Sequence, residues 1–178
     1  MGTTVDLELI SSAEMLKSGL DKIYTPGRIY KAHDPVYGEV RAMFVLTVGV
    51  IAINGSPMYP VTASWTVAGD FLCDDNEDGS GVVGEEWCVG AWLGGVTTAA
   101  AYGFVQVYGL NLVPLTTDAS LAAKDTLLPT TADGTWEGID SNTLMTAGTD
   151  NPATRCGMVM ANTVARGTVL LDVHQTTC

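Results

Sequence analysis

The residues best suited to chemistry in this chain are the acids between Asp74 and Glu85, in the segment Asp-Asp-Asn-Glu-Asp-Gly-Ser-Gly-Val-Val-Gly-Glu. Their order fits a calcium-binding loop, Asp-x-Asn-x-Asp-Gly with a later Glu. Carboxylate and amide oxygens are the ligands that Ca²⁺ prefers, and the glycine permits the sharp turn that gathers them. An EF-hand also needs a helix on each side, whereas residues 65–73 and 86–93 resemble strands or loops. This context favours a solvated acidic hairpin tip, with calcium binding as the alternative.

The polar residues do not form a set suited to nucleophilic catalysis. His33-Asp34 precedes a proline in a turn, where an aspartate usually caps backbone amides. Ser80 lies between glycines, but the surrounding acids oppose its activation. His174 is expected in an exposed tail, and the sequence has neither a strained glycine-flanked nucleophile nor a phosphate-binding loop. We therefore predict no enzymatic activity, no catalytic residue, no metal ligand and no cofactor.

The four cysteines, Cys73, Cys88, Cys156 and Cys178, have neither the close spacing of a zinc site nor a matching set of histidines. The first residues lack the charged and apolar regions of an export signal. We therefore expect reduced, buried thiols. The alternative is that Cys73 and Cys88 face each other at the base of a hairpin and become oxidised after release from a cell.

Four tryptophans, Trp65, Trp87, Trp92 and Trp136, could line a sugar-binding face. In β-proteins such side chains more often fill the core or an interface. We expect the second arrangement.

Composition excludes several classes of partner. The net charge of the 178-residue chain is −12, and an acidic surface repels phosphate backbones, so we expect no nucleic acid. The longest apolar run, residues 42–53, is too short to span a bilayer, so we expect no membrane. Twenty glycines and seven prolines indicate many turns between short strands.

The only helical pattern lies in residues 1–24, which we predict to be an N-terminal arm or short helix. Ser11 and Glu14 fit a capping box, and Gly19 is suited to end a helix near residues 11–18. The apolar positions at helical spacing are Leu9, Ala13, Leu16 and Leu20. Two interpretations remain: a helix on the edge of its own domain, or an arm that becomes ordered on a partner.

Residues 25–178 are predicted to form one mainly β domain, a compact sandwich or barrel of short antiparallel strands. Asp133-Gly134 is a strong hairpin signal between two of the strands. The predicted strands are residues 41–48, 50–54, 61–67, 87–93, 102–108, 111–115, 126–130, 155–161 and 168–173.

Residues 90–109 indicate two short strands joined by a turn of small residues. In the second strand, alternation places Val105 and Val107 on one face and Phe104 and Tyr108 on the other. We expect the two valines to face the core and the two aromatic residues to face a second layer or a partner.

The order of several motifs across residues 30–173 resembles the small head proteins of tailed bacteriophages, the capsid decoration or cement group. An aromatic-Gly-aromatic-Val-Gln-Val strand precedes a Thr/Ala/Gly/Asp-rich stretch and a closing strand pair. The acidic segment from Asp74 and the cysteines depart from the usual pattern of the group, and the resemblance brings no catalytic residues. The motifs are Asp34-Pro-Val-Tyr-Gly, Glu39-Val-Arg-Ala-Met-Phe-Val-Leu, Tyr102-Gly-Phe-Val-Gln-Val-Tyr-Gly, Asp125-Thr-Leu-Leu, Thr131-Ala-Asp-Gly, Arg155-Cys-Gly-Met-Val-Met-Ala and Ala165-Arg-Gly-Thr-Val-Leu-Leu-Asp-Val.

The resemblance implies a virion structural protein that binds the major capsid protein on the outer face of a phage head and stabilises the shell. Such a protein would assemble in the host cytoplasm and remain on the capsid surface, and a homotrimer near a local threefold axis is the expected oligomer. One alternative is another particle component, such as a head fibre base or a tail-associated protein. A second is a calcium-dependent binding module that uses the Asp74–Glu85 segment and exposed tryptophans.

Overall fold

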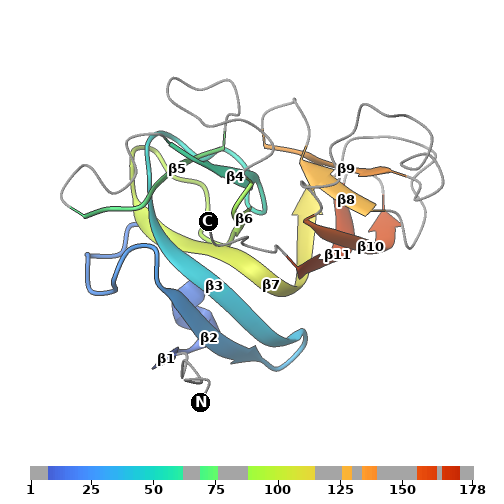
Figure 1. The fold of residues 1–178 in the computed structure, drawn as a ribbon, viewed down its shortest axis with the longest axis horizontal. Coiled ribbons are helices and arrows are strands. Elements are labelled where there is room, and N and C mark those ends of the chain that lie inside the picture. Colours follow the sequence, from blue (N-terminus) through green and yellow to red (C-terminus); the bar gives the residue numbers. More distant parts are fainter. Residues whose placement is uncertain are drawn as a thin grey trace, which may run out of the picture.

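The protein is mainly β, as predicted. A computed structural model describes residues 8–61, 69–75, 88–114, 126–129, 134–139, 156–163 and 166–172. These ranges hold one short helix, α1 (Ser12–Met15), and a set of strands that form a single continuous sheet (Figure 1). The strands are β1 (Glu8–Leu9), β2 (Ile29–Asp34), β3 (Gly38–Thr47), β4 (Pro57–Pro60), β5 (Leu72–Asp74), β6 (Gly90–Trp92), β7 (Tyr102–Pro114), β8 (Thr126–Pro129), β9 (Trp136–Ile139), β10 (Gly157–Thr163) and β11 (Arg166–Asp172).

The first part of the sheet closes into a small barrel. The strand order is β1-β2-β3-β5-β4-β6-β7-β11-β10-β8-β9, and an additional antiparallel pairing between β3 and β7 joins β3, β5, β4, β6 and β7 into a ring. The β1–β2 and β3–β5 pairings are parallel. The expectation of antiparallel strands alone is therefore wrong at these two pairings, both of which join strands separated by a connecting segment.

Among the described residues, the hydrophobic core comprises three clusters, two of which lie on opposite faces of β3 and β7. The barrel-interior cluster contains Met43, Val45, Ile51, Met58, Cys73, Val89, Trp92, Val105 and Val107. The N-terminal cluster contains Met15, Tyr30, Ala32, Val40, Ala42, Phe44, Leu93 and Phe104. Val105 and Val107 thus face the core, and Phe104 faces a second packed layer, as the alternation predicted. Tyr108 is half exposed and lies against Arg41, whose guanidinium carbon is 4.9 Å from the ring centroid.

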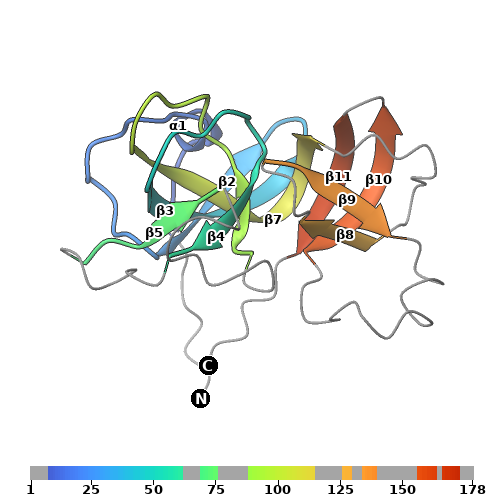
Figure 2. The same cartoon turned by 90° about the horizontal axis from the view of Figure 1, so that it is seen from above.

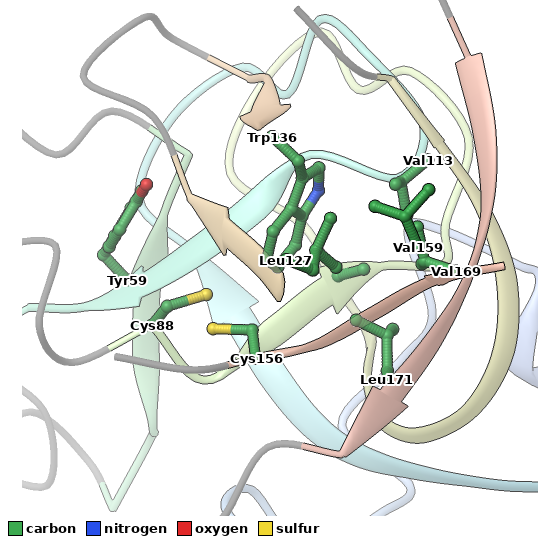
Figure 3. Packing of buried hydrophobic residues seen from close by; sticks show 10 residues of the cluster. Tyr59, Cys88, Val113, Leu127, Trp136, Cys156, Val159, Val169 and Leu171 are labelled. Carbon is green, nitrogen blue, oxygen red and sulfur yellow. The ribbon is translucent and has the colours of Figure 1, made fainter. Parts of the chain in front are cut away.

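The third cluster joins the barrel to the rest of the sheet, a smaller part formed by β11, β10, β8 and β9 that begins on the second half of β7 and is here called the smaller sheet. In Figure 2 this smaller sheet lies at one side of the barrel, and β7 runs from one into the other. The C-terminal cluster contains Tyr59, Cys88, Ala91, Val113, Leu127, Trp136, Cys156, Val159, Val169 and Leu171 (Figure 3). Because Tyr59, Cys88 and Ala91 come from the barrel side, the two parts share one apolar interior.

The N-terminal helix is a single turn. The Glu14 backbone N–H donates to Ser11 Oγ over 3.1 Å, so the predicted cap is confirmed. The helix ends after Met15, which is the buried residue, whereas Leu9 and Leu16 are exposed. The predicted helical stripe ending at Gly19 is therefore wrong. One turn with few tertiary contacts cannot propagate through Ser18-Gly19, because glycine is a poor helix former.

Residues 8–24 lie on their own domain. β1 pairs with β2, and Leu20 forms a bridge with Tyr102. Lys22 Nζ lies 2.7 Å from the buried carboxylate of Asp70, which also accepts a 2.9 Å hydrogen bond from the Tyr102 hydroxyl. The hydrogen bond to Asp70 raises the pKa of Lys22, while burial, followed by the hydrogen bond to Asp70, raises the pKa of Tyr102. Residues 8–24 therefore pack on the domain, and residues 1–7 lie outside the described residues.

Several strand boundaries differ from the prediction. Residues 50–54 form turns rather than a strand, and the two strands predicted within residues 102–115 are one strand, β7. Most of the strand predicted at residues 61–67 lies outside the described residues. The predicted hairpin around Asp133-Gly134 is confirmed by the antiparallel pairing of β8 with β9. β2 was not predicted. Buried Tyr30 and Ala32 alternate with more exposed residues in this strand, but the adjacent proline turn led us to expect a turn-rich segment here.

β7 bends where it leaves the barrel. Gly109 has φ of +110°, and β7 then pairs with β11 instead of β3. The Nε2 group of buried Gln106 donates to the backbone oxygens of Tyr108, at 3.2 Å, and Leu110, at 3.1 Å. One buried side-chain amide thus spans both sides of the glycine, which fixes the direction of the bend.

We expect Gly109→Ala to destabilise the protein by about 3 kcal/mol, which would lower the Tm by roughly 5–12 °C. A Cβ atom there would lie 2.5 Å from the Glu39 backbone oxygen, and the φ value is one that alanine rarely adopts. Gly49→Ala is the matched control, because a Cβ at Gly49 meets nothing within 4 Å. Thermal denaturation followed by circular dichroism measures both variants. Equal Tm values for the two would show that the bend tolerates a side chain.

Candidate interaction surface

The predicted calcium loop lies largely outside the described residues. Asp74 ends β5, and its Oδ1 accepts a 2.9 Å hydrogen bond from the backbone N–H of Asp75. Residues 76–87, including Ser80, are not among the described ranges, nor is His174. Within the described ranges, no group of three or more histidine, cysteine, aspartate or glutamate side chains could hold a metal ion.

Asp34 has the turn-capping role predicted for it. Its Oδ1 accepts hydrogen bonds from the backbone N–H groups of Val36, at 2.8 Å, and Tyr37, at 2.9 Å. These bonds shape the β2–β3 hairpin turn. His33 is exposed and lies opposite Glu39 in the strand register. Asp34 therefore stabilises the turn, rather than acting as the acid that orients His33 as a catalytic base.

Two of the four tryptophans lie in the core. Trp92 and Trp136 are fully buried, and their indole N–H groups donate to the backbone oxygens of Gly95, at 3.0 Å, and Gly55, at 2.7 Å. Burial confirms the expected core position of both, so neither contributes to a sugar-binding face. Trp65 and Trp87 lie outside the described residues.

Three cysteines, Cys73, Cys88 and Cys156, are buried free thiols, and Cys178 lies outside the described residues. Burial raises the pKa of the Cys73 thiol well above its ordinary value. Such a thiol stays protonated and unreactive at neutral pH. The surroundings of Cys73 are those of a structural cysteine.

In the part of the chain that the structure describes, exposed apolar side chains lie on two hydrogen-bonded loops at one end of the barrel, residues 48–53 and 94–100, here called the apolar loop pair. Val96 is 63% exposed and Val50 54% exposed. The other exposed members are Val48, Ala52, Ile53, Gly95, Thr98, Ala99 and Ala100. Exposed apolar groups of this kind typically mark a binding surface when they are contiguous.

Buried anchors hold the two loops together. The Ile51 N–H donates to Thr97 Oγ1 over 2.8 Å, and the Thr97 N–H donates to the Ile51 backbone oxygen over 3.0 Å. Thr47 Oγ1 accepts a 2.9 Å hydrogen bond from the Ala101 N–H, which ties the base of both loops. Since Ile51, Thr97 and Thr47 are buried, the exposed side chains are presented on a fixed scaffold. A preorganised surface loses less conformational entropy when it binds.

The apolar loop pair is also uncharged in a strongly acidic protein. The sequence has no charged residue between Arg41 and Asp70, or between Glu86 and Asp118. These two uncharged runs contain both loops, and together they are the sequence signal that could have revealed the surface. An uncharged, apolar surface of this kind is suited to contact with another protein surface.

In the part of the chain that the structure describes, the N-terminal region carries several cations, and these are paired with carboxylates. The five lysines and arginines between residues 17 and 41 each form an ion pair with a carboxylate. Lys31 and Arg41 both form ion pairs with Glu39, and their hydrogen bonds lower the pKa of the Glu39 carboxyl. Cations engaged in this way are poorly suited to binding a phosphate backbone.

Other exposed apolar side chains lie apart from the apolar loop pair along the chain. Leu9, Leu16 and Ile23 belong to the N-terminal segment, and Val36 and Tyr37 to the β2–β3 hairpin. Met158 and Met160 point outward from β10. In the part of the chain that the structure describes, no helix is long and apolar enough to cross a membrane.

Comparisons with known protein families, with curated proteins and with solved structures gave no match.

Proposed function

We propose that this protein is a capsid decoration protein, a virion structural component that binds the major capsid protein on the outer face of a tailed-phage head. The observation that carries the proposal is the apolar loop pair: an exposed, uncharged surface on two hydrogen-bonded loops of an acidic β-protein. The order of motifs across residues 30–173 resembles that of phage head proteins, and this resemblance is the reason for proposing a phage capsid as the particle. The protein is proposed to assemble in the host cytoplasm and to remain on the capsid surface.

The apolar loop pair is suited to a protein that binds many equivalent sites on a repeating capsid lattice. A small contact on one copy gives modest affinity, but many copies on a finished shell add up to a large stabilisation of that shell. Closed symmetry favours a trimer at a local threefold axis, where one loop pair from each copy contacts the shell. Binding to nucleic acid or catalysis is not part of the proposed role.

The N-terminal leucines are proposed as secondary anchors. Leu9 and Leu16 are exposed and lie on an ordered segment, so they are available for contact with a neighbour. Trp92 and Trp136 cannot serve in this way because both are fully buried.

The test is binding of the purified protein to phage shells prepared without it. We expect co-sedimentation with expanded shells but not with unexpanded ones, and a higher melting temperature of the decorated shells. Val96→Asp should weaken binding at least tenfold, because it places a charge in an apolar contact. The Tm of the isolated variant should change little, since Val96 is exposed.

Val36→Asp is the matched control. Val36 is 77% exposed on the hairpin turn at the start of β3, whereas the apolar loop pair adjoins the opposite end of that strand. The control variant should bind shells like the unmodified protein. If Val36→Asp abolished binding and Val96→Asp did not, the docking face would be wrong. If the unmodified protein bound neither form of the shell, the decoration proposal would fail.

A further inference from the structure

Two buried cysteines from distant parts of the chain meet in the C-terminal cluster. Figure 3 shows the sulfur atoms of Cys88 and Cys156 pointing toward one another. Cys88 lies just before β6, on the barrel side of the cluster, and Cys156 just before β10, in the smaller sheet. From the sequence we expected reduced thiols, with a pair of Cys73 and Cys88 as the alternative. Cys73 belongs to the barrel-interior cluster, and an electrostatic interaction with Cys88 adds to the effect of burial in raising the pKa of its thiol.

The backbone on both sides holds this arrangement. The Cys156 N–H donates to the Leu127 backbone oxygen over 3.1 Å, and its carbonyl accepts from the Asp172 N–H over 3.0 Å. The residue after Cys88, Val89, donates its N–H to the Met58 backbone oxygen over 2.8 Å. Hydrogen bonds of the adjacent backbone therefore hold both cysteines beside the ends of paired strands.

Each of the two thiols has a hydrogen-bond partner. The Cys88 thiol lies 3.7 Å from the Gly90 backbone oxygen, within reach of a weak sulfur hydrogen bond. A hydrogen bond to Cys88, followed by burial, raises the pKa of the Cys156 thiol well above its ordinary value. Cys88 is 7% exposed and Cys156 2% exposed. Cys88 is thus the more accessible of the pair and the better first target for a small oxidant.

We propose that Cys88 and Cys156 form an oxidative modification site, at which a peroxide converts the two thiols into a disulfide that links the barrel to the smaller sheet. The Cys88 thiolate attacks one oxygen of hydrogen peroxide, and the O–O bond breaks. Cys88 becomes a sulfenic acid, and the released hydroxide takes up the thiol proton to form water. The Cys156 sulfur then attacks the Cys88 sulfur, and the S–O bond breaks. The hydroxyl group leaves with the Cys156 proton as a second water, so two electrons pass from the thiols to the peroxide.

The modification would change the stability of the protein according to its surroundings. Thiols stay reduced in a cytosol and become oxidised outside it. The disulfide would close a long segment of chain, which restricts the unfolded ensemble. The inference does not depend on the proposed capsid role, because it concerns contacts within one chain.

The test is oxidation of the folded protein with hydrogen peroxide, followed by digestion without reductant. Trypsin cleaves at Arg155 and a glutamate-specific protease at Glu86, so Cys73, Cys88 and Cys156 fall in different peptides. We expect a linked peptide pair containing Cys88 and Cys156. The Tm should rise by roughly 5–15 °C and return to its starting value after treatment with dithiothreitol.

Two variants make the result specific. The double variant Cys73→Ala/Cys178→Ala keeps only the proposed pair and should retain the gain in Tm, whereas Cys156→Ala should lose it. The second variant also controls for methionine oxidation by the peroxide, since it keeps exposed Met158 and Met160. A link between Cys73 and Cys88, or conversion of Cys88 to sulfinic acid with no link to Cys156, would overturn the proposal.

Discussion

Val107→Asp is expected to abolish cooperative folding at neutral pH. Val107 lies on β7 in the barrel-interior cluster and is almost fully buried. It also stands at the irregularity between β3 and β7, where Arg41 pairs with Tyr108 and Ala42 with Gln106, so it has no cross-strand partner in β3. A carboxylate placed there would enter a cluster of apolar side chains. The cost of burying it, about 4 kcal/mol or more, approaches the whole stability of a typical domain.

The defect should depend on pH in a definite direction. Burial would raise the pKa of the introduced carboxyl above its value in the unfolded chain, because the charged form is disfavoured in an apolar interior. The folded variant is then least destabilised below the unfolded pKa, near pH 4, and loses stability as the pH rises from there through the higher folded pKa. Urea unfolding at pH 4 and pH 7, compared with the unmodified protein at each pH, measures this difference.

Val36→Asp again supplies the control, since it makes the same substitution at an exposed site. Its stability should stay within about 0.5 kcal/mol of the unmodified protein. A Val107→Asp protein with an unchanged urea midpoint would mean that the side chain at this position does not face the barrel interior.

Trp136→Ala is expected to destabilise the protein by about 3–5 kcal/mol. Trp136 on β9 is the largest side chain of the C-terminal cluster, and its indole N–H donates to the Gly55 backbone oxygen over 2.7 Å. This hydrogen bond crosses from the smaller sheet to the turn before β4. The substitution removes both the apolar contact and the polar one, so the two parts of the molecule lose their largest shared side chain.

Trp136→Phe separates the two contributions. Phenylalanine keeps much of the apolar contact but leaves the buried Gly55 carbonyl without its indole donor, for which we expect a loss of about 1–3 kcal/mol. Hydrogen exchange should then show lower protection in β8 to β11 than in β3. Uniform loss of protection across all strands would argue that the smaller sheet and the barrel unfold as one unit.

Local signals in the sequence predicted the parts of the fold that depend on neighbouring residues. The Asp133-Gly134 signal predicted the β8–β9 hairpin, although the connection between Pro129 and Trp136 is longer than a two-residue turn. The alternation around Val105 predicted which side chains enter the barrel because successive side chains on a strand point to opposite faces. The Ser11 cap was also local and was predicted correctly.

Features that depend on distant contacts were missed. Gly109 appeared to end a strand, but the chain continues because β11 supplies new hydrogen-bond partners. Closure of the barrel by β5 could not be expected, since this strand is only three residues long and adjoins the acidic segment. From the sequence we predicted a strand at residues 50–54 and a turn of small residues within residues 90–109, where the structure has the apolar loop pair. Its exposure follows from the bonds between Ile51 and Thr97, two residues far apart in the sequence.

The position of β7 imposes an order on folding during synthesis. β3 cannot complete its pairing until residues 102–108 have left the ribosome, and the barrel strands are all present once residue 114 has emerged. The smaller sheet forms when β11 pairs with the second half of β7. The residues of β11 are synthesised much later than those of β7. Translation delivers N-terminal segments first, and pairing of distant strands is slow. For a time, therefore, the far half of β7 is an unpaired strand edge on a finished barrel, where the nascent chain is most exposed to pairing with another copy.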